Sequence, residues 1–401
     1  MQPFRSKLKR FGLHAGQVAQ KLGVLPPGAA YKYLQHETPM EHVKRTHLQS
    51  EVASHLEMVH PQAAARNPLP FNIADRAMLP DESGWWGYSM RDVPSRTSSP
   101  TYLAKIADAK IILAVDGRGQ FCPAILTGDK RALNLREIVF RDPHIAILRR
   151  NPPARNLKRA TWLFERVYDN HSHWLTAHLP KLCLLRDRDE LADLLLPEEL
   201  TPAIRTSFAT LGIDPAAYRT FKTGEVLEVE ELTVLVTDRF RGELLRPVRD
   251  AFTSPNEAGA HRRIYISRAK AAMRQLANEE EVWPLFAEAG FERVFMEDLS
   301  FEDQIQLMSQ TKVLAAPHGA GLTNMMFCPP GGYVIEIAWL GFPNPNFYAL
   351  ASAMNLSYGL VPAQDSDGGG DPLRRDLSVE PAAVKEVLHV LNERLQAEPP
   401  S

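Results

Sequence analysis

The feature that most constrains the fold is a regular alternation of short apolar runs and amphipathic segments over residues 264–338. Four of these runs have the length and composition of buried strands: residues 264–266, 293–296, 313–316 and 334–338. Helix-start signals separate them, because Asn278 precedes Glu281 by three residues and Ser300 precedes Asp303 by three residues. Strands that alternate with helices across short loops predict a doubly wound parallel sheet.

A similar but less regular pattern precedes this block. Strands are expected at residues 111–115, 145–148, 182–185 and 232–236, and helices at 162–179 and 190–195. The sequence therefore predicts two Rossmann-like α/β units, an N-terminal domain over 101–240 and a C-terminal domain over 241–362.

Two flanking regions lack this pattern. Residues 1–100 form a basic, proline-rich arm that contains Trp85 and Trp86, which could stack on a ligand but are expected to pack against a domain face. The first acidic residue is Glu37, so residues 1–36 predict either a solvated N-terminus or a helix that contacts an anionic membrane. Residues 363–401 read as a linker followed by an amphipathic helix.

Composition narrows the function classes. The 401 residues are 44% apolar, and 46 Lys plus Arg against 48 Asp plus Glu give a net charge of −2, which disfavours nucleic-acid binding. No apolar run reaches the ~18 residues of a membrane span, and no secretory signal is recognisable. Three widely spaced cysteines predict neither a disulfide framework nor a zinc site. These features favour a cytoplasmic globular protein.

The strongest candidate for a ligand site is the turn that follows the strand at 313–316. Its residues His318, Gly319, Ala320 and Gly321 combine a histidine with glycines that allow close approach of the backbone, and a helix start follows. Such a turn suits a diphosphate, although a merely tight turn would look the same.

A second basic loop follows the strand at 264–266. It carries Ser267, Arg268 and, further on, Arg274, and guanidinium groups bind phosphate through two parallel hydrogen bonds. A solvated basic loop is the simpler interpretation of either residue alone. Because the carboxyl ends of parallel strands meet at one edge, the two loops together favour an anion site.

Other polar clusters carry weaker signals. Asp169 and His173 stand before a helix and are candidates for a general base or an acceptor contact, against a structural role. The pair Asp187 and Asp189 resembles a metal-binding Asp-x-Asp, but such a pair is expected by chance in this chain. Five histidines between His36 and His60 have no chelating spacing and are expected on the surface.

Several ordered blocks resemble glycosyltransferase family 61. The blocks are residues 170–182, residues 263–279 (RIYISRAKAAMRQLANE), residues 298–304 (DLSFEDQ) and residues 315–330 (AAPHGAGLTNMMFCPP) with the following VIEI. Their order runs over about residues 100–360.

The resemblance implies a GT-B fold, with a nucleotide-sugar donor on the C-terminal domain and the acceptor on the N-terminal one. It implies an inverting hexosyl- or pentosyltransferase with no cofactor and no obligatory metal, the charge of the leaving diphosphate being balanced by Arg268, Arg274, His318 and the amides of residues 319–321. Asn324 and Glu336 match family positions, and Glu336 is expected on the donor ribose or sugar.

The resemblance also suggests a bacterial cytoplasmic member, peripheral on the inner membrane, that adds sugar to a glycan or glycolipid acceptor during surface polysaccharide synthesis. His173, with Asp169 as second choice, is the expected catalytic residue. Two alternatives stay open: a protein of this fold that binds nucleotide sugar or carbohydrate without turnover, and a metal-dependent Asp-x-Asp transferase.

Overall fold

The computed structural model describes residues 31, 34–47, 55–254, 259–366, 368 and 371–398. The chain divides into two compact units, each made of two separate segments. Unit 1 comprises Met1–Gln62 and Ser99–Asp238, and unit 2 comprises Ala63–Ser98 and Arg239–Ser401. Most of the basic segment 1–36, for which a membrane-contacting helix was considered, lies outside the described residues.

Unit 1 is a mixed α/β unit. In chain order its elements are β1 (Gln35–Glu37), α2 (Pro39–His47), β2 (His55–His60), β5 (Thr101–Val115), β6 (Phe121–Leu126), β7 (Arg131–Leu133), α3 (Asp142–Arg150), β8 (Ala154–Trp162), α4 (His171–His173), the π-helix η4 (Trp174–His178), α5 (Leu179–Asp187), β9 (Leu195–Pro197), α6 (Pro202–Thr210), η5 (Pro215–Ala217), β10 (Arg219–Phe221) and β11 (Val226–Val236).

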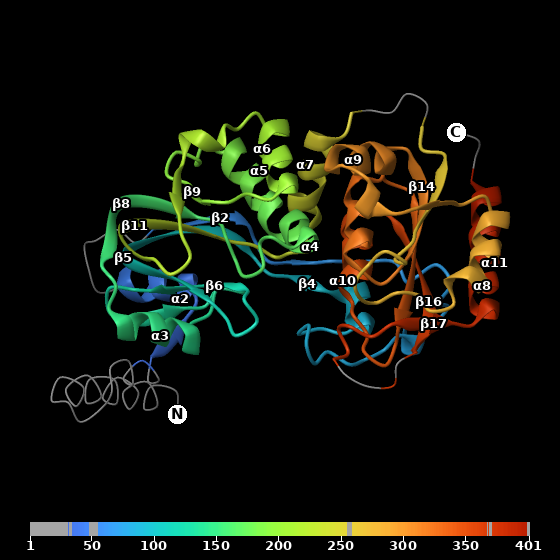
Figure 1. The fold of residues 1–401 in the computed structure, drawn as a ribbon, viewed down its shortest axis with the longest axis horizontal. Coiled ribbons are helices and arrows are strands. Elements are labelled where there is room, and N and C mark those ends of the chain that lie inside the picture. The colour runs from blue at the N-terminus through green and yellow to red at the C-terminus, as the bar shows by residue number, and fades with distance from the viewer. Residues whose placement is uncertain are drawn as a thin grey trace. The chain divides into compact units, whose positions relative to one another are not determined.

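The main sheet of unit 1 differs from the doubly wound parallel sheet expected there. Its order is β1-β7-β6-β5-β11-β8, with β2 also paired to β5. The long strand β5 pairs antiparallel with β2, β6 and β11, and only the β1–β7 and β11–β8 pairs of this sheet are parallel. Helix α3 packs on β5 through Ile145, which lies in a cluster with Ile112 and Ala124 (Figure 1).

Several predictions of helices and strands in unit 1 were wrong. Residues 145–148 and 182–185, expected as strands, lie in helices α3 and α5. The helix expected over 162–179 begins only at His171, because β8 continues to Trp162. Residues 190–194 contain a turn at 192–193 and an isolated bridge at Leu194 in place of the expected helix, and β9 follows. Short apolar runs do not distinguish a buried strand from a buried helix, which explains the first two errors.

Unit 2 contains the expected parallel sheet. Its elements are β3 (Ala63–Ala64), η2 (Arg76–Met78), η3 (Met90–Ser95), β4 (Thr97–Ser98), α7 (Gly242–Phe252), β12 (Arg262–Ile266), α8 (Glu279–Glu288), β13 (Glu292–Val294), η6 (Met296–Asp298), α9 (Phe301–Ser309), β14 (Thr311–Pro317), the 3₁₀ helix η7 (Ala320–Phe327), β15 (Tyr333–Trp339), α10 (Asn346–Ala353), β16 (Ser357–Asp365), β17 (Leu377–Val379) and α11 (Pro381–Ala397).

The sheet order is β13-β12-β14-β15-β16-β17, and every pair is parallel except the last. Helices α8 and α11 lie side by side on one face, and α9 and α10 lie on the other (Figure 1). The core between the sheet and the first pair includes Tyr265, Phe286, Ile335 and Leu391. The chain order 2-1-3-4-5 places a topological switch point between β12 and β14.

Two helix-start signals had different outcomes. Ser300 caps α9 as expected, because its side chain accepts a hydrogen bond from the Asp303 amide at 3.1 Å. Asn278 does not cap α8 in this way. Its side chain instead donates to the Val379 carbonyl and accepts from the Val379 amide, and so joins α8 to β17.

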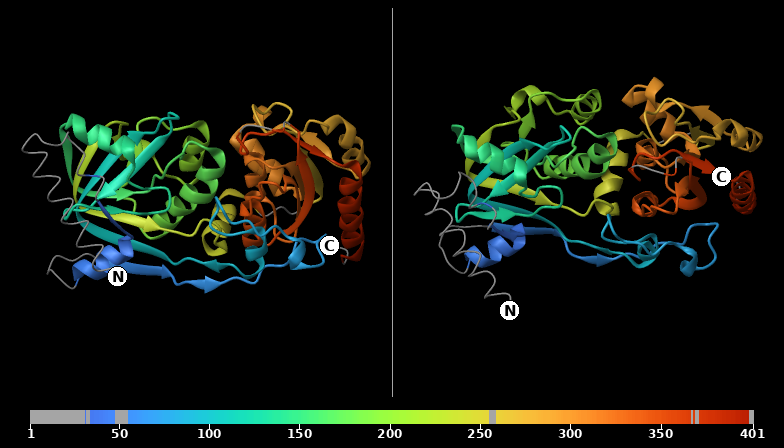
Figure 2. Two further views of the ribbon diagram at one scale, coloured as in Figure 1. Left: turned by 90° about the horizontal axis from the view of Figure 1, so that it is seen from below. Right: turned by 60° about the horizontal axis from the view of Figure 1, so that its bottom comes forward.

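The segment 63–98 packs within unit 2 although about 140 residues separate it from the rest of that unit. Phe71 donates its amide to the Tyr358 carbonyl at 2.7 Å, and the Asn72 side chain bonds both backbone groups of Leu360. Figure 2 shows this light-blue segment beside the orange and red elements of the same unit. Among the described residues, no helix is long and apolar enough to cross a membrane.

Candidate ligand site at the switch point of unit 2

The two loops with phosphate-binding signals leave the sheet at its switch point. Ser267 and Arg268 follow β12, and His318 and Gly319 follow β14, the neighbouring parallel strand. Successive crossovers leave these strands in opposite directions, and ligands of open α/β sheets bind in the crevice that this opens at the carboxyl ends. The fold therefore brings together two loops that are about 50 residues apart in sequence.

Arg268 lies directly against the Gly319 backbone. Its guanidinium donates to the carbonyls of Arg274 and Met273 at 2.8 and 2.7 Å, so its position is fixed by its own loop. A Cβ atom at residue 319 would overlap this guanidinium. Gly319 is thus required for close approach, not for an unusual backbone angle, since its φ of 174° is extended.

Arg274 supplies a second positive charge at the same place. It has a left-handed φ of 58°, which is uncommon for a non-glycine residue. Its Nε is buried and has no hydrogen-bond partner within the described part of the chain. Burial lowers the pKa of Arg274, and burial followed by the charge of Arg274 lowers the pKa of Arg268 to about 10. Both groups remain cationic at neutral pH.

Arg274 and His318 line one small cavity of about 30 Å³ in unit 2. Its other lining residues are aromatic, apolar, amide and basic: Trp86, Ala338, Trp339, Phe342, Asn344, Pro372, Leu373, Arg375 and Leu377. Arg375 is ion-paired with Asp365 and lies 4.9 Å above the Trp339 ring, whereas Arg274 forms no ion pair with a described residue. Of the two guanidinium groups that line this cavity, Arg274 is therefore the one without an ion pair among the described residues, although the charge of Glu336 favours its cationic form.

His318 is held by a buried carboxylate. Its Nδ1 contacts Glu336 Oε1, and the other Glu336 oxygen accepts from the Tyr358 hydroxyl at 2.6 Å. The Nε2 atom of His318 lies 3.3 Å from Asn344 Nδ2 on the cavity side. Burial, followed by the Glu336 charge, raises the pKa of Tyr358 well above its usual value, so the phenol remains a donor. The hydrogen bonds from Tyr358 through Glu336 to His318 orient the imidazole towards the cavity.

The other predicted donor residues have internal partners. The Ser267 hydroxyl donates to Glu279 at 2.5 Å, and the Asn324 amide donates to Gln304 at 3.0 Å. Both side chains are fully buried and support the loops. Ala320 and Gly321 begin the helix η7, whose first amides have no acceptor inside that helix.

Asp169 and His173, the predicted catalytic residues, belong to unit 1, whereas all predicted donor residues belong to unit 2. Asp169 is exposed on the turn before α4, and His173 is partly buried. The side chain of Asn170 accepts from the His173 amide at 3.2 Å, which fixes the start of the helix.

A buried ion pair in unit 1 was missed by sequence reasoning. Lys181, in the first family-like block, pairs with Glu165, and each side chain is less than 5% exposed. Burial alone would raise the pKa of Glu165, but the charges of Lys181 and Arg136 lower it to about 2. His178 accepts from the Glu165 amide at 2.9 Å. A lysine within the apolar run 179–185 was the available signal.

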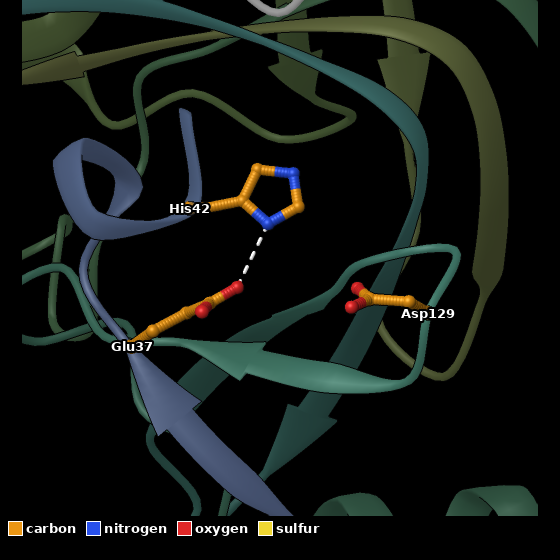
Figure 3. Close-up of side chains that lie close together, drawn as sticks. All are labelled: Glu37, His42 and Asp129. Carbon is orange, nitrogen blue, oxygen red and sulfur yellow. Dashed lines mark hydrogen bonds and ion pairs between the residues drawn. The ribbon is translucent and has the colours of Figure 1, made fainter. Parts of the chain in front are cut away.

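The histidine segment also contributes to a partly buried cluster, in which Glu37 and His42 are buried and Asp129 is exposed. Glu37, His42 and Asp129 place ligand atoms within 4.8 Å of one another (Figure 3), so the expectation that His42 lies on the surface was wrong. Arg45 bonds both carboxylates at 2.7 and 3.0 Å, and Arg131 contacts both at 3.3 and 3.2 Å. Two guanidinium groups already balance the two acids, which fits a structural network better than a cation site.

The Asp-x-Asp pair has no comparable arrangement. Asp187 ends α5 and pairs with its neighbour Arg186, and Asp189 is exposed at a φ of 57°. Neither residue joins a group of three metal-ligating side chains within the described ranges.

A larger cavity of unit 2 contains none of the predicted residues. It measures about 460 Å³ and lies where β16 begins, at the opposite end of that strand from the switch-point edge. Its lining comes mainly from three places: residues 63–68, the start of α7 and the end of α10. Volume alone would favour this cavity, but the partly buried charge of Arg274 and the switch point favour the smaller one.

Comparison with known proteins identifies related sequences. The glycosyltransferase 61 family model matches residues 171–335. An EGF domain-specific O-linked N-acetylglucosamine transferase from Drosophila melanogaster is 32% identical over 142 residues, which cover 32% of this chain. That match spans about a quarter (26%) of the relative's length. The segment that matches the family model includes Arg268, Arg274, His318 and Gly319, and over residues 171–335 this chain is similar to glycosyltransferase family 61, as its ordered motifs predicted.

Proposed function

We propose that unit 2 binds a nucleotide sugar and that the protein transfers its sugar, a hexose or pentose, to a hydroxyl of a glycan or glycolipid. The observation that carries this proposal is the partly buried Arg274 guanidinium, which lies beside His318 at the switch point. Its buried Nε has no hydrogen-bond partner, and the guanidinium forms no ion pair, within the described part of the chain. A buried cation without a partner is costly, and an anionic ligand removes that cost. The cavity is smaller than a nucleotide sugar, so most of the donor lies outside it, along the carboxyl edge.

The proposed chemistry is an inverting displacement. The acceptor oxygen bonds to the anomeric carbon, the bond from that carbon to the diphosphate oxygen breaks, and the acceptor proton passes to a base. Negative charge then develops on the diphosphate, where Arg268 and Arg274 stabilise it. The proposal requires no metal, because these two guanidinium groups supply positive charge.

His318 can donate to a phosphate oxygen through Nε2 only when it is protonated, since Nδ1 is held by Glu336. Because both Glu336 oxygens already have partners, we propose that Glu336 orients His318 and does not contact the ribose. His173, with Asp169 as second choice, is proposed as the base or acceptor contact from unit 1. The arrangement of the two units as a GT-B fold is part of the proposal.

The biological setting is proposed from the resemblance alone. It is synthesis of a bacterial surface polysaccharide by a cytoplasmic enzyme, with the basic residues of segment 1–36 in contact with anionic lipid. Loss of sedimentation with anionic vesicles after removal of residues 1–30 is the expected result, and unchanged sedimentation would disprove the lipid contact.

The donor site is tested by thermal unfolding with UDP, GDP and nucleotide sugars. A ligand that binds only the folded state stabilises it by RT ln(1 + [L]/Kd), about 2.7 kcal/mol at 100 Kd. We expect at least one of these ligands to raise Tm in the wild type, and Arg274→Ala to weaken its binding by about tenfold or more. Lys385→Ala removes an exposed charge from α11 of the same unit and is the matched control.

Two outcomes would contradict the proposal. Equal stabilisation of the wild type and Arg274→Ala would place the nucleotide elsewhere. Binding of a nucleotide sugar without release of nucleoside diphosphate, across a panel of sugar acceptors, would favour a binding protein without turnover.

A further inference from the structure

Trp85 of unit 2 is the most exposed of the large apolar side chains in the described part of the chain. Trp85 is 71% exposed, although tryptophan is among the residues that lose most by contact with water. Its neighbour Trp86 is partly buried and lines the Arg274 cavity. The two adjacent rings therefore have different environments.

The turn that carries Trp85 is firmly supported. The Trp86 indole donates to the Pro343 carbonyl at 3.0 Å, and the Tyr88 hydroxyl donates to Asn346 at 3.0 Å. The amides of Trp86 and Gly87 both donate to the Ser83 carbonyl, and Gly87 has a left-handed φ of 77° that suits glycine. Trp85 is thus exposed on a fixed turn.

The position of Trp85 is beside the proposed donor site. Its ring meets the Phe342 ring edge-on at 5.9 Å, and Trp86 meets the same ring at 6.0 Å. Phe342 and Trp86 line the cavity with Arg274 and His318, whereas Trp85 does not. Trp85 therefore lies one ring beyond the cavity, on its rim.

We propose that Trp85 is the platform on which a pyranose ring of the acceptor stacks. A pyranose has a face of C–H groups that suits the face of an indole, and its hydroxyls can remain in water. The acceptor oxygen must reach the anomeric carbon next to the diphosphate, so the acceptor ring occupies the space just outside the phosphate site. A nucleobase is separated from the leaving phosphate by the α-phosphate and the ribose, and it would extend away from this position.

The inference rests on the proposed function and adds a specificity-determining residue outside the segment that matches the family model, residues 171–335. The apolar groups around it, Phe342 and Trp86, come from two chain regions that also lie outside that segment. The acceptor class that follows is a glycan with an accessible C–H face on its terminal ring.

The test uses the full chain and saturation-transfer NMR with methyl pyranosides of glucose, galactose, xylose, N-acetylglucosamine and glucuronic acid, each with and without UDP. We expect at least one pyranoside to receive saturation on its ring protons in the wild type. Trp85→Ala should remove most of that signal, and Trp85→Phe should retain part of it because it keeps an aromatic face. Met78→Ala is the matched control, since Met78 is 63% exposed on η2 of the same unit.

Nucleotide binding is measured in parallel, so that a failure of the donor-site proposal can be distinguished from a failure of the acceptor-platform proposal. Trp85→Ala should keep the wild-type thermal shift with UDP or GDP, which also verifies its fold, while Arg274→Ala loses that shift. Saturation that is unchanged in Trp85→Ala, or absent for every pyranoside in the wild type, would overturn the platform. Loss of the nucleotide shift in Trp85→Ala would assign the ring to the nucleobase instead.

Discussion

At the scale of single residues, the motifs identified side chains that the fold of unit 2 brings together, but not the contacts that each side chain makes. Arg274 and His318 line a cavity, as a ligand-binding role requires. Ser267, Asn324 and Glu336 were placed in the same group, yet their side chains bond other buried groups. A motif shows which residues occur together in the sequence. Which of them faces a ligand depends on their hydrogen-bond partners, such as Glu279 and Tyr358, and the positions of these partners are known only from the folded structure.

Gly319 offers a residue-scale test of the site. Gly319→Ala places a methyl group where the Arg268 guanidinium lies, and Arg268 can move only by giving up its bonds to the Met273 and Arg274 carbonyls. We expect a loss of stability of about 1–3 kcal/mol from overpacking. We also expect nucleotide binding to weaken by about tenfold or more, because both arginine positions shift. Urea unfolding and nucleotide titration measure the two effects.

Gly117→Ala is the control, because a Cβ there meets nothing within 4 Å. If Gly319→Ala binds nucleotide as tightly as Gly117→Ala does, the Arg268–Gly319 contact has no part in donor binding.

At the scale of elements, the predictions were most accurate where apolar strands and amphipathic helices alternate regularly along the sequence. Strands β12 to β15 of unit 2 and helix α11 were predicted because buried parallel strands are short, uniformly apolar and separated by helices. Strands β16 and β17 of the same sheet were not predicted. Unit 1 was predicted less well. Its central strand β5 spans 15 residues and pairs antiparallel on both sides, and the helical run 179–187 has apolar residues on most faces. Neither has the period that distinguishes helix from strand.

The cluster around Glu37 joins three elements, β1, α2 and β7, and predicts a pH dependence. Burial alone would raise the pKa of Glu37, but hydrogen bonds from His42 and Arg45 and the charges of Arg45 and Arg131 lower it from 4.5 to about 2. A depressed carboxyl pKa adds stability at pH above the unfolded value. That contribution, of the order of 3 kcal/mol, is lost as pH falls from about 4.5 to 2.

Glu37→Gln isolates this effect from the other acids. We expect the variant to be less stable than the wild type at neutral pH and the difference to shrink towards zero near pH 2, as measured by urea unfolding with circular dichroism. A difference that is independent of pH would mean that Glu37 contributes through packing and not through its charge.

At the scale of the whole molecule, each unit is assembled from segments distant in sequence. Unit 2 needs residues 63–98 as well as residues 239–401, because the first segment supplies Trp86 to the cavity and Phe71 to the core. Sequence reasoning treated that segment as an irregular arm, since its many prolines hide its contacts. Backbone bonds to β16 take the place of a regular strand there.

Phe71 tests this dependence. Its ring lies over Gly359, where a Cβ would overlap it, and 5.7 Å from the Tyr333 ring, and Arg394 of α11 bonds its carbonyl at 3.1 Å. Phe71→Ala should destabilise unit 2 by about 3 kcal/mol or more through the cavity that it leaves. Hydrogen exchange measured by mass spectrometry should then be faster in β16 and α11, while peptides from β5 and β11 of unit 1 keep their exchange rates. The same substitution should reduce the thermal shift that nucleotide produces. Equal acceleration in both sets of peptides would show that the two units do not unfold separately, and unchanged exchange in β16 would show that the segment 63–98 is dispensable for the donor-binding unit.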